Sequence, residues 1–184
     1  MTENQNAAAE FDPDTSEEQS PSALEALIGR IEEEMRKCQL AKFSQEDALA
    51  LGLLIIELAT ERELPVAVDI RRGAHILFHV SLSGATPDND VWVERKSRTA
   101  ERFGIPSLLV GLRGRRGGGR MEDNAWFDQS AYAAHGGAFP VYVRGTGPVA
   151  VVTVSGLPQV ADHELVVEAL TKFTRRKKKT APAT

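Results

Sequence analysis

The sequence is organised around residues 87–103, PDNDVWVERKSRTAERF. An acidic residue, Asp88, follows Pro87 in N-cap position, so we predict that a helix begins there and runs to Phe103. On a helical wheel, one face collects the residues spaced i, i+4, i+7 and i+11, which are Trp92, Lys96, Thr99 and Phe103. A second face is basic and carries Arg95, Arg98 and Arg102.

Lys96 therefore lies in the middle of a stripe that otherwise faces the core. A cation in such a place either extends its amine to water or has a charged partner. Asp90 and Asp162 are the carboxylates that we consider for a purely structural pair. Any functional chemistry is expected close to this lysine.

The length of 184 residues predicts one domain with tails. We expect a disordered acidic tail over 1–21, a single domain over 22–174 and a basic flexible tail over 175–184. The net charge of −4 argues against a general nucleic-acid binder. The one cysteine, Cys38, fits a reducing compartment. There is no signal-peptide pattern, and the longest apolar run, 49–59, is shorter than the ~20 residues of a membrane helix, so we expect a cytoplasmic protein.

Two helices are predicted before the central one. A capping box at Ser22–Glu25 begins the first, and Ser44 caps the second, which ends near Glu63. Its core-facing residues are expected to be Leu49, Leu53, Ile56 and either Ala59 or Thr60. In the first helix, the three adjacent glutamates 32–34 point in three directions, so we interpret them as a solvated face and not as a metal site.

The strands are predicted from alternating or short apolar patterns. Residues 66–71 and 74–82 form one hairpin, residues 141–144 and 149–154 form another, and the apolar run 107–112 indicates a fifth, buried strand. Further helices are expected over 122–134 and 162–173, the last capped by Asp162. Five strands with helices packed against them predict an α+β fold with a mainly antiparallel sheet.

Two histidines of the first hairpin share one strand face. His75 and His79 lie roughly 13 Å apart at about 3.3 Å per residue, so they cannot bind one small metal ion together. Each alone has the chemistry to bind a haem iron or line a pocket, but a polar surface position is the commoner role.

The segment 113–120, RGRRGGGR, resembles the arginine–glycine boxes that bind RNA. It is a single short copy without aromatic residues, so a mobile surface loop is the preferred interpretation. No serine lies in a nucleophile elbow, and no phosphate-binding loop motif is present. His163 lacks a second histidine one turn on, because Val167 stands there, so a zinc-protease motif is excluded.

Three motifs occur in order: PDNDVWVERK at 87–96, YAAHGGAFPV at 132–141 and VSGLPQVADHELV at 154–166. Together they resemble the haem-degrading/GlcG-like family (HbpS-like), particularly its branch of small bacterial and fungal proteins, from about Ser44 to Phe173. The resemblance implies a profilin-like α+β fold and a homo-oligomer, either a dimer or a larger ring. The arginine–glycine segment and the acidic tail depart from the family pattern and inherit no role.

The resemblance implies binding, or slow degradation, of haem or a similar anionic ligand. Such a pocket needs cations for carboxylates, aromatic walls and a histidine for the iron. His135 and His163 are the preferred iron ligands, because both lie at element ends within the motifs. The candidate ligand-binding residues are Trp92, Arg95, Lys96, Arg98, His135, Gly136, Gly137, Pro140, Asp162 and His163.

Two other functions stay open. In a non-catalytic oligomeric interaction module, the same tryptophan and arginines serve as interface anchors. Nucleic-acid binding through 113–120 and the basic C-terminus is a weaker alternative. The sequence leaves undecided whether the protein is an enzyme.

Overall fold

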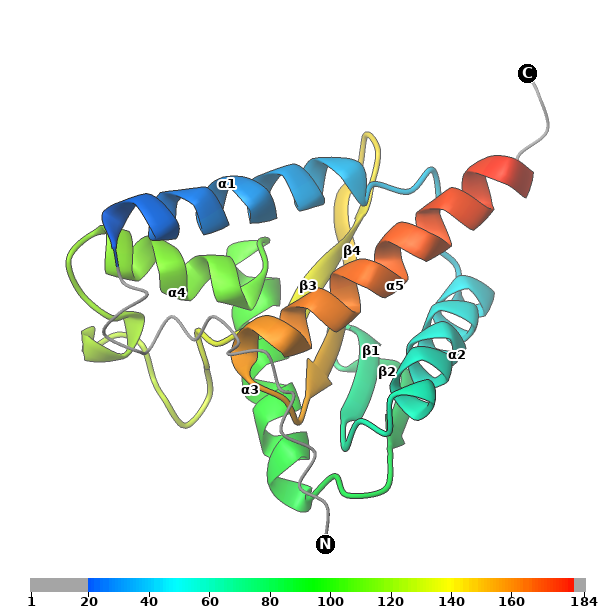
Figure 1. Cartoon of the computed structure of the whole chain (residues 1–184), viewed down its shortest axis with the longest axis horizontal. Helices are drawn as coiled ribbons and strands as arrows, with labels where there is room; N and C mark the ends of the chain where they lie inside the picture. The colour runs from blue at the N-terminus through cyan, green and yellow to red at the C-terminus, as the bar shows by residue number, and fades with distance from the viewer. Residues whose placement is uncertain (1–19, 181–184) are drawn as a thin grey trace, which may run out of the picture.

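The computed structural model describes residues 20–180, with side chains to Lys177, and it shows an α+β fold (Figure 1). The predicted acidic tail up to residue 19 and the last four residues lie outside this range. The elements in order are α1 (Pro21–Lys37), α2 (Gln45–Glu61), β1 (Ala67–Arg72), β2 (His75–Ser81), α3 (Pro87–Phe103), α4 (Ser107–Arg116), the 3₁₀ helix η1 (Met121–Asp123), β3 (Ala138–Val143), β4 (Gly147–Ser155) and α5 (Gln159–Thr180).

The described residues form one antiparallel sheet of four strands in the order β2-β1-β4-β3. Both predicted hairpins are confirmed. The predicted fifth strand is wrong, because Ser107–Leu112 is the buried first part of α4. A short apolar run fits a buried strand and a buried helix equally well, so the pattern alone did not separate them.

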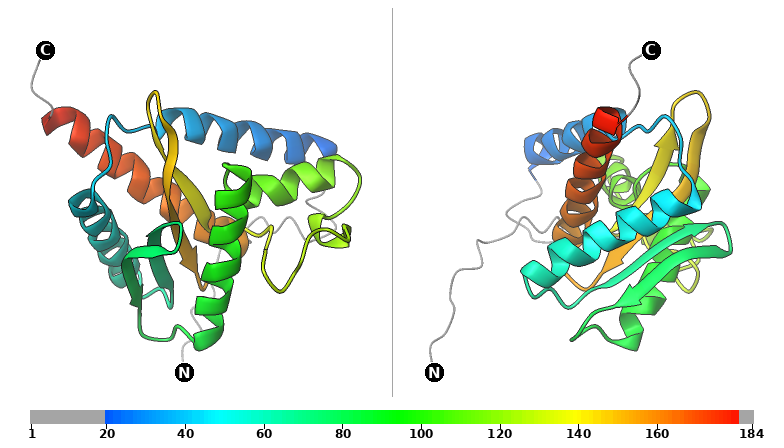
Figure 2. Two further views of the ribbon diagram at one scale, coloured as in Figure 1. Left: turned by 180° about the vertical axis from the view of Figure 1, so that it is seen from behind. Right: turned by 90° about the vertical axis from the view of Figure 1, so that its right-hand side faces the viewer.

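Helices cover both faces of the sheet. Helices α2 and α5 pack together on one face, and α3 lies across the other (Figure 2). Helix α1 packs on α4, beside the β3 side of the sheet (Figure 1). Alternate residues of β1 therefore serve two interfaces: Val68 and Ile70 enter the core under α2 and α5, whereas Asp69 faces α3.

The buried face of α2 differs from the prediction except at Ala59, which is fully buried. Leu49 and Leu53 are 51% and 55% exposed, whereas Leu51 and Ile55 are fully buried. Apolar residues occupy most positions from 48 to 59, so the hydrophobic pattern did not fix the rotation of this helix. Close contact fixes it instead, because Gly52 lies directly against the ring of Phe78 on β2.

Helix starts are decided by local hydrogen bonds. The predicted cap of α2 is confirmed, with Ser44 and Asp47 forming a capping box. Helix α1 begins two residues earlier than predicted, because its N-cap is Ser20, which accepts the Ala23 N–H, and not Ser22. Thr86, and not Asp88, is the N-cap of α3, and its N–H donates to the Asn89 side chain over 2.7 Å.

Two predicted helices near the C-terminus also differ. Residues 122–134 do not form an α-helix: the first two belong to η1, and turns and loop follow over 124–134. Helix α5 runs from Gln159 to Thr180, longer than predicted at both ends, so Asp162 lies inside its first turn and is not its cap. The helix thus extends six residues into the segment 175–184 that we predicted to be a flexible tail.

The segment 113–120 is half helix. Arg113 and Arg116 belong to α4 and form ion pairs with Glu32 and Glu25 of α1. The three adjacent glutamates have three different sets of partners, as their helical spacing implies: Glu33 pairs with Arg36 and Lys37 of its own helix, and Glu34 meets His163. In the part of the chain that the structure describes, no three His, Cys, Asp or Glu side chains are grouped as metal ligands. None of the described helices is long and apolar enough to span a bilayer.

Gly52→Ala tests the contact between α2 and β2. A Cβ at this position would lie 2.5 Å from the Phe78 ring, so we expect the free energy of unfolding to fall by about 1–3 kcal/mol in denaturant titrations. Gly29→Ala on α1 is the control, because its Cβ meets nothing within 4 Å and alanine favours a helix. Equal stability of Gly52→Ala and the wild type would contradict the contact.

Candidate functional site

A pocket of about 250 Å³ lies between the first turns of α3 and the start of α5. Helical spacing places Asp88, Trp92 and Lys96 on one face of α3, and the β4–α5 connection supplies the opposite side. The lining residues are Asp88, Asn89, Trp92, Lys96, His135, Ser155, Gly156, Leu157, Gln159 and Asp162.

The base of the pocket is a buried ion pair. Lys96 Nζ lies 2.7 Å from Asp162 Oδ2, and the two residues are 4% and 0% exposed. The other carboxylate oxygen, Oδ1, accepts the Leu157 N–H over 3.0 Å, so Asp162 also holds the turn before α5. Burial raises the pKa of Asp162 to about 6, although the neighbouring Lys96 ammonium acts in the opposite direction. Lys96 can lie on the apolar stripe of α3 because it is paired with Asp162, one of the two carboxylates that the sequence suggested.

The paired glycines of the second motif allow close backbone contacts. A Cβ at Gly136 would collide with the carbonyl oxygen of Gln159, and one at Gly137 with that of Val154. Gly137 also has a φ of 126°, which an L side chain rarely adopts. The turn is fastened to α4 by Ser107, whose hydroxyl donates to the His135 carbonyl over 2.5 Å. The two glycines therefore shape the site and place His135 at its rim.

Trp92 forms the wall of the pocket. Its Nε1 donates to Asp88 Oδ2 over 3.0 Å, and its ring meets the His135 ring edge-on at a centroid distance of 5.2 Å. The Arg95 guanidinium lies 4.5 Å from the Trp92 ring centroid. Arg95 Nε is buried without a hydrogen-bond partner among the described residues. Arg95 is thus a cation next to the pocket whose charge is not matched by a described carboxylate.

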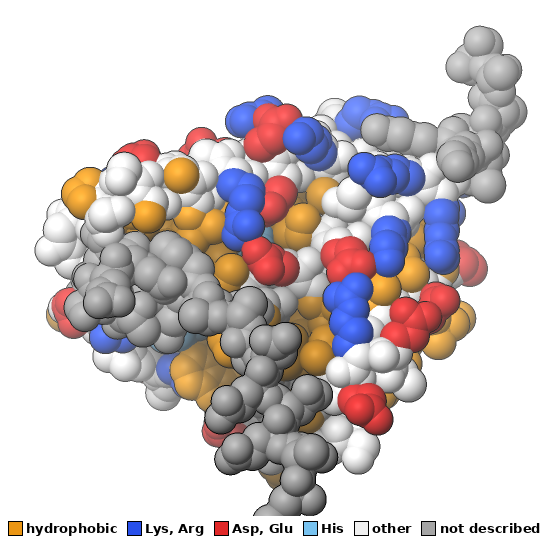
Figure 3. Space-filling view, in the orientation of Figure 1, with side chains coloured by type: hydrophobic (Ala, Val, Ile, Leu, Met, Phe, Trp, Pro, Cys, Tyr) orange, Lys and Arg blue, Asp and Glu red, His pale blue; other side chains and the backbone are white. Residues whose placement is uncertain are grey.

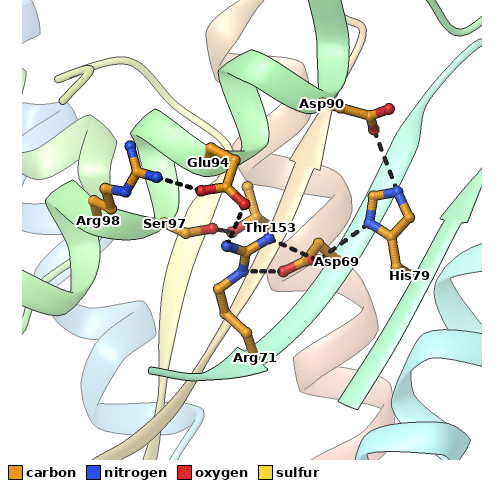
Figure 4. A network of polar contacts seen from close by, with 8 residues as sticks. All are labelled: Asp69, Arg71, His79, Asp90, Glu94, Ser97, Arg98 and Thr153. Atoms are coloured by element: carbon orange, nitrogen blue, oxygen red, sulfur yellow. Dashed lines mark hydrogen bonds and ion pairs between the residues drawn. The ribbon is translucent and has the colours of Figure 1, made fainter. Parts of the chain in front are cut away.

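Three predicted site residues lie elsewhere. Arg98 is on the far side of α3, where it pairs with Glu94 (Figure 4). Pro140 is buried in β3 and borders a different hollow. His163 is fully buried, with Nε2 3.0 Å from Glu34 and its ring against Phe139. These three do not line the pocket, and a ligand held there would not touch them.

Sequence reasoning missed a polar network that joins α3 to the sheet (Figure 4). Arg71 binds the fully buried Asp69 through two hydrogen bonds of 2.6 and 3.0 Å and donates to Glu94 on α3. The Arg71 guanidinium lowers the pKa of Glu94. The imidazole of His79 lies between Asp69 and Asp90, at 3.1 and 3.3 Å. The alternating strand pattern had placed His79 on a polar face, and that face is the one under α3.

The lining of the pocket carries one more acidic side chain than basic side chains. Asp88 and Asp162 offset Lys96, which leaves His135 and the neighbouring Arg95 as the groups with chemistry toward a ligand. Our candidate list missed Asp88, Asn89, Ser155, Gly156, Leu157 and Gln159. All six belong to the first and third motifs, so the motifs themselves were the available signal.

Lys96→Met leaves the Asp162 carboxylate buried without its counter-charge. Asp162 titrates in the folded protein near pH 6, above its ordinary value of 3.8, so folding takes up a proton between these values and stability falls as pH rises through them. Removing Lys96 raises the pKa of Asp162 further and extends that fall to higher pH. We expect Lys96→Met to lose about 3–5 kcal/mol at pH 8 and much less at pH 5, measured by urea unfolding.

Lys96→Met/Asp162→Asn is the matched control, since both charges are gone and the amide oxygen still accepts the Leu157 N–H. This double variant should be more stable than Lys96→Met at pH 8 and should lack its pH dependence. A Lys96→Met penalty that is constant from pH 5 to 8 would show that the pair is not the cause.

With this geometry established, comparison with known proteins identifies relatives. Residues 43–171 match the family model "Haem degrading protein HbpS-like". A UPF0303 protein of Streptomyces coelicolor is 54% identical over 146 residues, which are 79% of this chain and 92% of the relative.

Solved structures of other proteins have a similar fold. The crystal structure of the Ybr137w protein has a TM-score of 0.74 at 34% identity and covers 86% of this chain and 97% of its own. A PduOC–haem complex has a TM-score of 0.60, with 71% of this chain and 94% of its own covered; at 16% identity it shows a shared fold only. On the family match and the identity to these relatives, the chain belongs to the HbpS-like family of haem degrading proteins.

Proposed function

We propose that this protein binds haem, or a smaller planar anionic ligand, in the pocket between α3 and α5. One observation carries the proposal: Trp92, Lys96, His135 and Asp162, from three separate motifs, line one pocket in a chain of the HbpS-like family. Asp162 and Lys96 build the base, and Trp92 and His135 supply the surfaces that a ligand would meet.

His135 is the residue that fits an iron ligand. It lies at the rim on a turn fixed by Ser107 and the two glycines, and imidazole is a common axial ligand of haem. Trp92 offers an aromatic wall beside it. Arg95 fits a ligand carboxylate better than Lys96, because Lys96 is already paired with Asp162.

The size of the pocket limits how a ligand is held. About 250 Å³ is below the roughly 300–1,000 Å³ of typical small-molecule sites, so a porphyrin would enter only by one edge. We infer that the remainder lies over the Trp92 and Arg95 surface or against a second subunit. We further propose that the protein slowly degrades haem, a reaction that requires haem to bind first.

Haem titration of the purified protein, followed by the Soret band, tests this function. We expect a saturable shift at micromolar haem that is lost in His135→Ala and weakened about tenfold in Arg95→Gln, because one ligand bond or one charged hydrogen bond is removed.

His75→Ala is the control, since this exposed histidine lies on β2 outside the pocket. A Soret shift that survives in His135→Ala would remove His135 as the ligand. Absence of a saturable Soret shift in the wild type would contradict haem binding and leave only the smaller planar anionic ligand.

A second candidate function is a non-catalytic oligomeric interaction module. Leu49 and Leu53 on α2 and Ile76 on β2 are each about half exposed, at 51%, 55% and 52%. Strand β2 is an edge of the sheet, so its outer backbone groups are free to pair among the described elements. Large exposed apolar side chains beside a free edge favour a second copy of the chain as partner.

Leu53→Lys tests this alternative by placing a charge in the exposed apolar surface. We expect the mass measured by analytical ultracentrifugation to fall from that of an oligomer to that of the monomer, without loss of the fold, because the side chain faces outward. Trp126→Lys, at an exposed site away from this surface, is the control. A wild-type monomer would contradict the module.

A further inference from the structure

A second hollow, outside the pocket described above, is strongly basic. It has a volume of about 320 Å³ and lies where the C-terminal end of α1, the β3–β4 turn and α5 meet. Lys and Arg side chains gather over the C-terminal parts of α1 and α5 (Figure 3). Four of its lining side chains are cations, namely Arg36, Lys37, Arg144 and Arg175, and none is a carboxylate. Gln39, Thr171 and Thr174 complete the lining.

The hollow is held in shape by backbone contacts. After α1, the Leu40 N–H donates to the Tyr142 carbonyl and the Leu40 carbonyl accepts the Arg144 N–H, both over 2.9 Å. These two bonds fix the base of the Arg144 side chain against the end of α1. Cys38, the C-cap of α1, lies 3.7 Å from the Thr171 hydroxyl of α5 and joins the third element. A ligand would therefore meet preformed walls.

Two of the four cations lack a partner. Among the described residues, the guanidinium groups of Arg144 and Arg175 make no hydrogen bond or ion pair, and both side chains are exposed. Arg36 and Lys37 share a single carboxylate, Glu33. The local excess of positive charge is therefore not matched within the described part of the protein.

A buried hydroxyl group gives a second reason to expect a ligand, and this reason does not depend on charge. Thr174 is 4% exposed, lines the hollow, and its Oγ1 has no hydrogen-bond partner among the described residues. Buried polar atoms are normally paired, so an unpaired one at the wall of a hollow suggests a missing acceptor or donor.

We propose that this hollow binds an oligophosphate, that is, a soluble anion with two or more linked phosphate groups. Four cations from three elements surround one concavity, which suits several adjacent negative charges better than a single carboxylate. A concavity of about 320 Å³ suits a small ligand better than an extended nucleic-acid backbone, which needs a basic stripe. Arg144 and Arg175 would bind the phosphate oxygens, and the Thr174 hydroxyl would donate to one of them.

Isothermal titration calorimetry of the full chain with tripolyphosphate, at fixed ionic strength, tests the proposal. We expect saturable binding with one site per chain. Arg144→Gln and Arg175→Gln should each weaken it about tenfold, because each removes a charged hydrogen bond. Thr174→Val should weaken it several-fold without lowering the melting temperature, since the lost hydroxyl has no partner within the protein.

Arg116→Gln is the matched control, because it removes the same charge from an exposed arginine outside the hollow. It should change the affinity less than about twofold. The same titration with ATP separates two sources of the phosphate: equal affinities indicate free polyphosphate and tighter ATP binding indicates a nucleotide, and either supports the site. Absence of saturable binding, or equal effects of Arg116→Gln and Arg144→Gln, would overturn it.

Discussion

The buried pair of Lys96 and Asp162 is the interaction on which the rest of the site depends. It joins α3, on one face of the sheet, to α5, on the other, beyond the end of β4. Burial of a carboxylate is costly, and here the cost is offset by one ammonium group and the Leu157 N–H. Because both helices begin near the same end of β4, a pair that links them also brings Trp92 and the β4–α5 turn together as pocket walls.

A second polar junction fixes the same helix further along the sheet. Asp69, Arg71 and Glu94 join β1 to α3, and the Ser97 hydroxyl lies 2.8 Å from that of Thr153 on β4. Helix α3 is thus held on the sheet by polar contacts and a small apolar cluster of Ala100, Ala138 and Val151, whereas α2 and α5 pack through the main hydrophobic core. Polar contacts have directional geometry, so they fix the position and rotation of α3 more narrowly than apolar packing would.

The two hollows differ in a way that separates their chemistry. The pocket between α3 and α5 contains aromatic rings and a neutralised lysine, whereas the hollow beside the β3–β4 turn contains cations without acids. The first suits a planar ligand with a metal or a weak charge, and the second suits concentrated negative charge. The arginine–glycine segment belongs to neither, because Arg113 and Arg116 are matched by glutamates of α1. These ion pairs argue against the hypothesis that this segment binds nucleic acid.

The sequence by itself determined the local features and the family. The capping residues at Ser44, the two hairpins and the three motifs were readable because they depend on neighbours in the chain. The position of Lys96 on an apolar stripe predicted a partner, and Asp162 was one of two carboxylates considered.

Only the tertiary structure decided what depends on distant contacts. Residues 107–112 are helical because they pack between α1 and α3, and the rotation of α2 follows from the contact of Gly52 with Phe78. The same reason separates the site residues: His135 reaches the pocket because Gly136 and Gly137 let the backbones of α5 and β4 approach, whereas His163, in an equally suggestive motif, is enclosed by Glu34 and Phe139. Hydrophobic periodicity in the sequence indicates which face of a helix or strand is apolar, but not which other element covers that face.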